Sequence, residues 1–175
     1  MFGGRGDDYL NGGRGADQMR GNDGDDTLLG RQGDDVLLGD EGNDSLSGFT
    51  GRDIVYGGQG ADVMLGNGHD DIMIAGLLTP AGNQSVLEHL SGSLRDEWRS
   101  GRSYADRVAN IRNDASNASG RLNDVFLIGA NRDGQNVFDD GDADQVLGGS
   151  AVDLFFATVG SDSLDRSGSE FFEQL

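Results

Sequence analysis

The chain of 175 residues contains no cysteine, and its 13 basic residues are all arginine. Without cysteine, disulfides and zinc sites with thiolate ligands are excluded, while export from the cell is compatible with the absence but not demonstrated by it. No apolar run approaches the roughly 18 residues that span a bilayer. Glycine and charge begin by residue 3, so no signal peptide is visible. We therefore expect no membrane insertion.

Positive charge is scarce, because 31 acidic residues stand against 13 basic ones and give a net charge of −18. Nucleic acid is not expected as a partner, since binding phosphate requires a positive surface. Residues 1–74 hold 15 acidic residues and 5 arginines, and residues 122–175 hold 11 and 2, whereas residues 75–121 are nearly neutral. A segment as acidic as residues 1–74 repels itself and should be disordered unless a cation neutralises it.

Proline occurs once, but glycine occurs 31 times and recurs at a fixed period. Eight units of nine residues cover residues 3–74 without a break. Their first position is always glycine: Gly3, Gly12, Gly21, Gly30, Gly39, Gly48, Gly57 and Gly66. Their fourth position is glycine except in the last unit, which has His69: Gly6, Gly15, Gly24, Gly33, Gly42, Gly51 and Gly60. A period held at several positions is the signature of a repeat architecture.

The sixth and eighth positions of the units are equally regular. The sixth is always aspartate: Asp8, Asp17, Asp26, Asp35, Asp44, Asp53, Asp62 and Asp71. The eighth is large and apolar: Leu10, Met19, Leu28, Leu37, Leu46, Val55, Met64 and Met73. Calcium takes six to eight oxygen ligands from carboxylates and backbone carbonyls. Glycines let a short loop adopt positive φ and turn its carbonyls inward, and the last three residues of each unit predict a strand whose middle side chain faces inward.

The sequence "GGRGDDYLN" at residues 3–11 matches the nonapeptide G-G-x-G-x-D-x-U-x, and the array resembles the RTX family of haemolysin-type calcium-binding proteins. The resemblance implies a mainly β fold, the parallel β-roll, in which each unit is half a turn of a coil. Successive loops lie on alternate sides, and each calcium ion lies between loops two units apart. Asp8, Asp26, Asp44 and Asp62 would then line one edge, and Asp17, Asp35, Asp53 and Asp71 the other.

Three gaps on each edge imply about six calcium ions. The resemblance adds loop carbonyls as ligands, including those of glycines at the first, second and fourth positions: Gly3, Gly4, Gly6, Gly12, Gly13, Gly15, Gly21, Gly24, Gly30, Gly33, Gly39, Gly42, Gly48, Gly51, Gly57 and Gly60. His69 weakens the last site, because a β-carbon is strained at positive φ. Extracellular calcium modules have dissociation constants of about 0.1 to 1 mM, so we expect an array unfolded inside the cell and folded outside it.

A helical pattern follows the single proline, Pro80, and comprises Val86, Leu87, Leu90, Leu94, Trp98, Tyr104, Val108 and Ile111. Gly92 and Gly101 interrupt it, so one long helix or two shorter ones are both compatible with the sequence. Outward strand positions become apolar late in the array: Ile54, Tyr56, Val63, Leu65, Ile72 and Ile74. We expect the helix to cover that flank, with Trp98 as its anchor; the alternative is a groove for a partner protein.

The tail is predicted to be β-rich, with an apolar run at residues 125–128, a turn at Asp133 and Gly134, and a strand at Val137 and Phe138. Three decayed units follow, with Asp144, Asp153 and Asp162 at the sixth position. The interval from Gly66 to Gly148 is not a multiple of nine, which predicts a second block, separate from the first. Asp144 and Asp162 could share one further calcium ion, or this part could be a metal-free cap. Its end, "EFFEQL", resembles the C-terminal ends of large secreted bacterial RTX proteins.

Other motifs fail on inspection, and no catalytic constellation remains. Asp140, Asp142 and Asp144 begin like an EF-hand, but Gln145 replaces the required glycine. Arg5, Gly6 and Asp7 spell an integrin-type tripeptide, but the repeat itself dictates the glycine. The two histidines, His69 and His89, lack the spacing of a zinc site, and no G-x-S-x-G elbow occurs. We do not expect an enzyme.

We therefore predict a β-roll at residues 1–76, a helical cap at 77–121 and a β-rich cap with degenerate repeats at 122–175. The expected function is a secreted, monomeric calcium-binding module, disordered without calcium. It would support type I secretion and the folding of an upstream protein, with the secretion machinery and that upstream part as partners. The alternative is an adhesion or surface-layer module that binds carbohydrate or protein through the apolar flank or the acidic faces.

Overall fold

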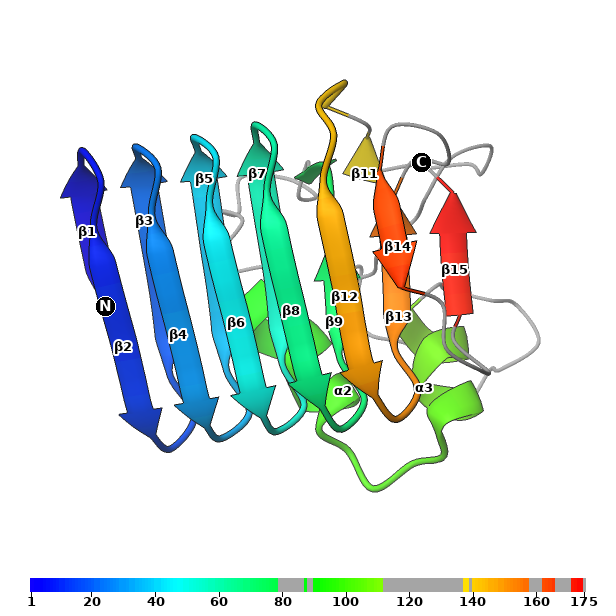
Figure 1. The fold of residues 1–175 in the computed structure, drawn as a ribbon. Helices are drawn as coiled ribbons and strands as arrows, with labels where there is room; N and C mark the ends of the chain where they lie inside the picture. The colour runs from blue at the N-terminus through cyan, green and yellow to red at the C-terminus, as the bar shows by residue number, and fades with distance from the viewer. Residues whose placement is uncertain are drawn as a thin grey trace.

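The computed structural model describes residues 1–78, 87, 90–111, 137–138, 140–157, 162–165 and 171–174. Two parallel sheets lie face to face and form a flattened coil (Figure 1). One sheet has the order β1-β3-β5-β7-β9-β13-β15 and the other the order β14-β12-β8-β6-β4-β2. Consecutive strands of the array thus alternate between the sheets, and the predicted parallel β-roll is confirmed.

The strands of the array recur once in every unit: β1 (Phe2–Arg5), β2 (Tyr9–Arg14), β3 (Gln18–Asp23), β4 (Thr27–Gln32), β5 (Val36–Glu41), β6 (Ser45–Thr50), β7 (Ile54–Gln59), β8 (Val63–Gly68) and β9 (Ile72–Ile74). Neighbours in a sheet come from units two apart, so that Leu10, for example, pairs with Leu28. One turn of the coil is therefore two units. The strands extend beyond the end of each unit, where they were expected to stop, because pairing continues through the second and third positions of the next unit, as between Gly13 and Arg31.

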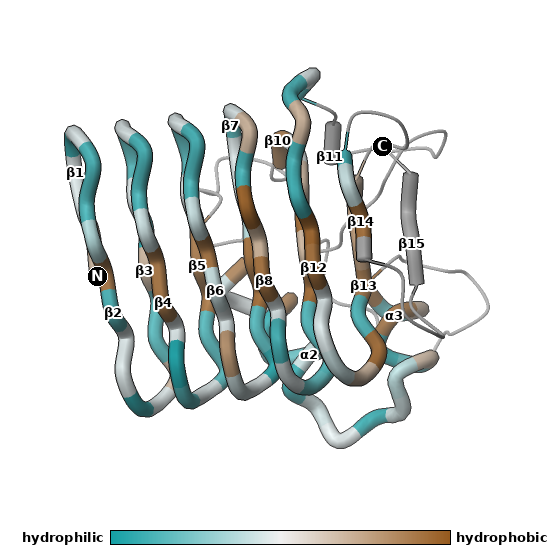
Figure 2. Tube along the Cα trace, viewed as in Figure 1, coloured by the Kyte–Doolittle hydropathy of each residue, from teal (hydrophilic) through white to brown (hydrophobic). Residues whose placement is uncertain are grey.

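The core between the sheets is built from one large apolar side chain of each unit. It contains the eighth-position residues and their equivalents near the C-terminus, all buried: Met19, Leu28, Leu37, Leu46, Val55, Met64, Met73, Val146 and Phe155. Figure 2 shows this as hydrophobic colour in the middle of the strands and hydrophilic colour in the loops at both ends. Each such side chain contributes about 1.5 to 3 kcal/mol on burial, and a unit supplies only one of them.

A second core lies on the outer face of the odd-numbered sheet, where the helical segment packs (Figure 1). The segment consists of a kinked turn η1 (Leu90–Leu94), α2 (Arg95–Trp98) and α3 (Tyr104–Ile111). Two short helical pieces are therefore present among residues 90–111, separated around Gly101. No helix in the described ranges is long and apolar enough to cross a membrane.

The predicted docking of the helix on the late flank is confirmed for one sheet and wrong for the other. The buried cluster joins the helical segment to these strand residues: Val36, Leu38, Ile54, Tyr56, Ile72, Ile74, Leu154 and Phe156. Val63 and Leu65 belong to β8, which lies in the opposite sheet, and both stay only partly buried. Strand parity decides the outcome, because successive units face opposite sides of the coil. Trp98 is fully buried, as expected of an anchor.

The prediction of a second, separate block near the C-terminus is wrong. Strand β12 (Gln145–Ser150) pairs in parallel with β8, and β13 (Leu154–Ala157) pairs with β9, so the same coil resumes. Strands β14 (Ser163–Asp165) and β15 (Phe171–Gln174) add the outermost layer. Met64 pairs with Val146, so a long insertion interrupts a single turn of the coil. Pairing requires only that the strand returns to the sheet edge, so the insertion need not keep the period.

The insertion leaves the coil after β9 and returns before β12. Near its two ends, β10 (Leu77–Leu78) pairs antiparallel with β11 (Val137–Phe138), which confirms a strand at residues 137–138. The predicted strand at 125–128 and the turn at 133–134 lie outside the described residues.

We call the junction of the β8–β9 turn with the β12–β13 turn the seam. The division of the chain at residues 76 and 121 stays a prediction.

Candidate calcium edges

The sixth-position aspartates form two continuous columns, one on each edge of the coil. On the Asp8 edge, each backbone N–H donates to Oδ1 of the aspartate one turn later, at 2.7–3.3 Å, through Asp8, Asp26, Asp44, Asp62, Asp144 and Asp162. On the Asp17 edge the same bond, at 2.7–2.8 Å, links Asp17, Asp35, Asp53, Asp71 and Asp153. The sequence prediction of two edges therefore agrees with the structure, and both columns continue across the insertion, from Asp62 to Asp144 on one edge and from Asp71 to Asp153 on the other.

The other carboxylate oxygen of these residues is buried and finds no hydrogen-bond donor within the described part of the chain. This holds for Oδ2 of Asp17, Asp26, Asp35, Asp44, Asp53, Asp62, Asp71 and Asp144. Buried polar atoms in folded proteins almost always have a partner. A whole column of unsatisfied, negatively charged oxygens therefore fits a cation as the missing partner.

The first-position glycines make room for this oxygen. A Cβ added to Gly39 would lie 2.0 Å from Oδ2 of Asp44 and 2.6 Å from the carbonyl oxygen of Gly57, which belongs to the next turn. Around Gly30 the corresponding distances are 2.5 Å to Oδ2 of Asp35 and 2.9 Å to the carbonyl oxygen of Gly48. A carboxylate oxygen thus lies beside every first-position glycine of the array, and a carbonyl oxygen joins it at six of the eight, so a side chain at these positions would overlap them.

The first-position glycines of the array do not have positive φ; residues at the second and fourth positions of the units do. At the fourth position the glycines stack closely: a Cβ on Gly51 would lie 1.9 Å from the carbonyl oxygen of Gly33. His69 keeps the left-handed backbone of this position, with φ of 77°. The second position also accepts residues with side chains in this conformation, which the sequence did not reveal: Asn22, Arg31, Asp40, Phe49 and Asn67. Each such residue costs about 1 to 3 kcal/mol.

Some of these strained residues have local partners. Arg20 forms an ion pair with Asp40 and Asn67 donates to Oγ of Ser47, while the Arg31 guanidinium lies over the Phe49 ring at 5.0 Å. The contacts hold the loop conformation where glycine is absent.

Burial raises the pKa of the column carboxyls, and neighbouring aspartates of like charge raise it further. The pKa of Asp35 and of Asp44 rises to about 6, that of Asp53 and of Asp144 to about 7, and that of Asp62 to about 8. The pKa of Asp71 lies well above its usual range for the same reasons. Desolvation penalises the charged form, so the ionised columns need positive charge. A divalent cation bound at the columns would supply it.

The chemistry of the donors suits calcium. Carboxylate and carbonyl oxygens are hard ligands, and within the described residues no group of three or more His, Cys, Asp or Glu side chains offers a softer or denser site. Each loop instead places one column carboxylate beside a first-position glycine, in most units together with a backbone carbonyl oxygen of the next turn. The donor set therefore fits a cation that accepts many oxygens in a flexible geometry.

Comparison with known families gives the same answer for the first part of the chain. The model of the RTX calcium-binding nonapeptide repeat matches four times, at residues 1–28, 12–46, 29–64 and 47–77. Residues 1–77 are an RTX calcium-binding repeat array. No curated protein and no solved structure matches the chain. RTX repeats bind calcium as a structural ion, which agrees with the geometry of the columns.

The RTX columns extend further than the family match. Asp144 and Asp162, predicted as a tail site, continue the Asp8 edge. Asp153 continues the Asp17 edge and was not among the predicted ligands, although the sequence places it at the sixth position of "GGSAVDLFF". Asp140 was missed as well: its Oδ2 is buried without a partner among the described residues, and its charge raises the pKa of Asp62 and of Asp144. The irregular interval across the insertion had concealed these links.

Proposed function

We propose that the chain is a calcium-triggered folding module that stays disordered in the calcium-poor cytoplasm and winds into its coil outside the cell. The observation that carries the proposal is the pair of aspartate columns, in which eight buried Oδ2 atoms, those of Asp17, Asp26, Asp35, Asp44, Asp53, Asp62, Asp71 and Asp144, lack a hydrogen-bond donor in the described part of the chain. Bound calcium would neutralise these carboxylates and complete their coordination with loop carbonyls. Without it, a net charge of −18 and a core with only one large apolar side chain from each unit favour the unfolded chain.

We propose calcium sites at the steps between successive column aspartates. The hydrogen bonds define five steps on the Asp8 edge and four on the Asp17 edge. Six of these steps lie within the array, and three involve Asp144, Asp153 or Asp162. The column aspartates and the carbonyls of the loop glycines would be the ligands. At a free calcium concentration about ten times the dissociation constant, each site would stabilise the fold by about 1.4 kcal/mol.

The setting of the module is also proposed. Calcium sites of about 0.1 to 1 mM affinity are filled outside cells and empty inside them, so a type I secretion system would receive an unfolded chain. The secreted module, as a monomer, would then fold and help an upstream part of the same polypeptide to fold. Support comes from the repeat family and from the acidic composition.

A calcium titration of the chelator-treated protein tests this function. We expect a cooperative rise of β signal in far-ultraviolet circular dichroism near millimolar calcium, with no response to magnesium. Calorimetry should count more than six bound ions if the steps at and beyond the seam are occupied. A protein that is already folded in chelator and binds few ions would contradict the proposal.

One observation favours a second function, adhesion through carbohydrate. The apolar flank is covered by the helical segment, but a pocket of about 440 Å³ opens on the even-numbered sheet, lined by Arg14, Arg31 and Phe49 among others. A partly exposed ring next to guanidinium groups suits an acidic sugar. Binding of acidic oligosaccharides at saturating calcium, weakened by Phe49→Ala, would support it. If no acidic oligosaccharide binds saturably, the adhesion function is contradicted and the folding function is the one supported.

A further inference from the structure

The two loops that meet at the seam on the Asp17 edge both lack the fourth-position glycine. His69 has φ of 77° and Ala151 has φ of 97°. The loops are direct neighbours, because the Asp71 N–H donates to Oδ1 of Asp153 at 2.7 Å and the Val152 N–H donates to Oδ1 of Asp70 at 3.3 Å. Residues with a β-carbon avoid this backbone region, so these two loops need support that the glycine-containing loops do not.

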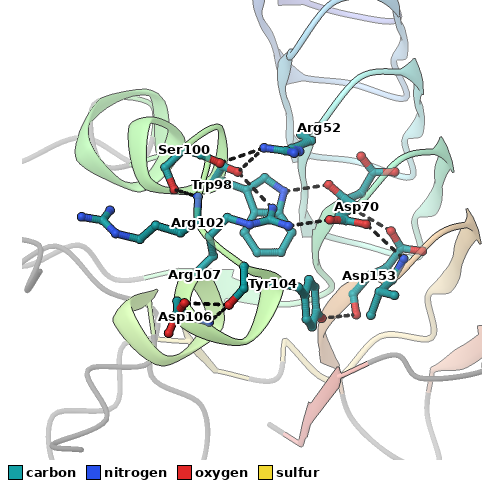
Figure 3. Close-up of polar contacts among 12 residues, drawn as sticks. Arg52, Asp70, Trp98, Ser100, Arg102, Tyr104, Asp106, Arg107 and Asp153 are labelled. Carbon is teal, nitrogen blue, oxygen red and sulfur yellow. Dashed lines mark hydrogen bonds and ion pairs between the residues drawn. The ribbon is translucent and has the colours of Figure 1, made fainter. Parts of the chain in front are cut away.

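The helical segment provides contacts at this place (Figure 3). The Trp98 indole Nε1–H donates to the carbonyl oxygen of Asp70 at 2.9 Å, and the Arg107 guanidinium forms an ion pair with the Asp70 carboxylate. The Tyr104 hydroxyl donates to the carbonyl oxygen of Asp153 at 2.9 Å. Asp70 precedes Asp71 and follows His69, so these bonds fix both sides of the seam beside its strained residues.

The three donors form one packed unit, which we call the seam clamp: Trp98, Tyr104 and Arg107. The Arg107 guanidinium lies 4.5 Å from the Trp98 ring centroid and 5.6 Å from that of Tyr104, and the two rings meet edge to face at 5.7 Å. Arg107 also donates to the Trp98 carbonyl oxygen at 3.0 Å. Trp98 and Arg107 are buried, so packing holds the clamp in one arrangement in the folded chain.

We propose that the seam clamp consists of positioning residues that hold the His69 and Ala151 loops in the calcium-binding conformation, so that an ion binds between Asp71 and Asp153. The inference rests on the proposed function, because it assigns these residues to one site of the calcium column. It gives the helical segment a role beyond covering apolar surface. The clamp does for the seam loops what glycine does in the other loops of the array.

Terbium bound in place of calcium isolates the seam site. Trp98 is the single tryptophan, so luminescence excited through tryptophan reports ions near the clamp, whereas direct excitation of terbium reports all bound ions. Asp153→Asn identifies the part of the tryptophan-excited signal that comes from the seam. Release is then followed after a chelator is added to the loaded full chain, with circular dichroism confirming that each variant folds when loaded.

Tyr104→Phe removes one hydrogen-bond donor and keeps the ring. We expect release from the seam site to accelerate about threefold to tenfold, which corresponds to one hydrogen bond, while release of the other ions stays unchanged. Tyr9→Phe, at a residue that is 64% exposed on β2, is the matched control and should change neither signal.

Glycine replacement separates positioning from general stabilisation. His69→Gly with Ala151→Gly, introduced into the Tyr104→Phe chain, should return seam release to within about twofold of the original rate, because the loops no longer need the clamp. Unchanged seam release in Tyr104→Phe, equal acceleration at all sites, or failure of the glycines to restore it would each overturn the clamp. A chain that binds neither terbium nor calcium would instead contradict the proposed function.

Discussion

The two outer faces of the coil share one repeat but differ in what they carry. On the odd-numbered sheet, the outward residues of β5, β7 and β9 are buried beneath the helical segment. On the even-numbered sheet, Thr27, Leu29 and Val63 stay only partly buried. Both sheets keep the same inward core and the same aspartate columns. The repeat thus determines the interior and the loops, and it leaves the outward positions free to specify a docking surface on one face.

Removal of the Trp98 side chain should have the largest effect on stability, because it anchors the helical segment on the odd-numbered sheet. Trp98→Ala leaves a cavity between the helical segment and the odd-numbered sheet, and we expect a loss of about 3 to 5 kcal/mol in the free energy of unfolding. Leu29→Ala, at a partly buried residue of the even-numbered sheet, should cost less than about 1 kcal/mol. Urea unfolding at saturating calcium measures both. Equal losses would mean that the helical segment does not stabilise its face.

A change in one column should affect one edge of the coil only. Asp35→Ala removes the aspartate that joins the step from Asp17 to the step to Asp53, so two adjacent calcium sites should be lost. When free calcium is about ten times the dissociation constant, the loss of two sites lowers the free energy of unfolding by about 3 kcal/mol. Calorimetry should find two fewer ions. A full ion count in this variant would contradict the assignment of the Asp17 edge.

Substitution of a first-position glycine tests whether a β-carbon fits beside the column carboxylate. Gly39 suits this test because its φ is not positive, so alanine introduces no backbone strain. Gly39→Ala would bring a Cβ to 2.0 Å from Oδ2 of Asp44, and such overpacking costs about 1 to 3 kcal/mol. The calcium affinity of the Asp44 step should fall with it. The control is Gly101→Ala, because no atom of the described chain lies within 4 Å of its added Cβ. Similar thermal unfolding of the two variants would rule out the steric explanation.

Protonation of the column carboxyls at low pH should partly replace calcium in stabilising the fold, and this is the smallest of the expected effects. The pKa of Asp53 is raised to about 7 and that of Asp62 to about 8, against 3.8 when unfolded, so the metal-free fold binds more protons than the unfolded chain. Its stability should rise as pH falls from about 8 toward 4 and be lost again as pH increases. Circular dichroism in chelator should show β signal increasing over that range. A signal that decreases on acidification would contradict it.

Much of the fold and the site could be predicted from the sequence, because the period of nine directly encodes the loop glycines, the column aspartates and the inward apolar residues. The two edges and the anchor Trp98 followed from that period and from helical spacing. Three features did not. The resumed coil at β12 was hidden because strand pairing tolerates an insertion of any length. Left-handed Arg31 and Phe49 carry no sequence signal of their conformation, and Asp153 was separated from its column by the insertion.

The seam has a consequence for the order of folding. Pairing within the array joins residues only two units apart, so each turn can wind onto the previous one through a short loop. Pairing of β12 with β8 joins residues across the whole insertion and must wait for a much longer loop to close. The last turns are therefore expected to add after the array has wound. The coil gains its final layers in a separate kinetic step, and until then the array ends in the open edges of β8 and β9.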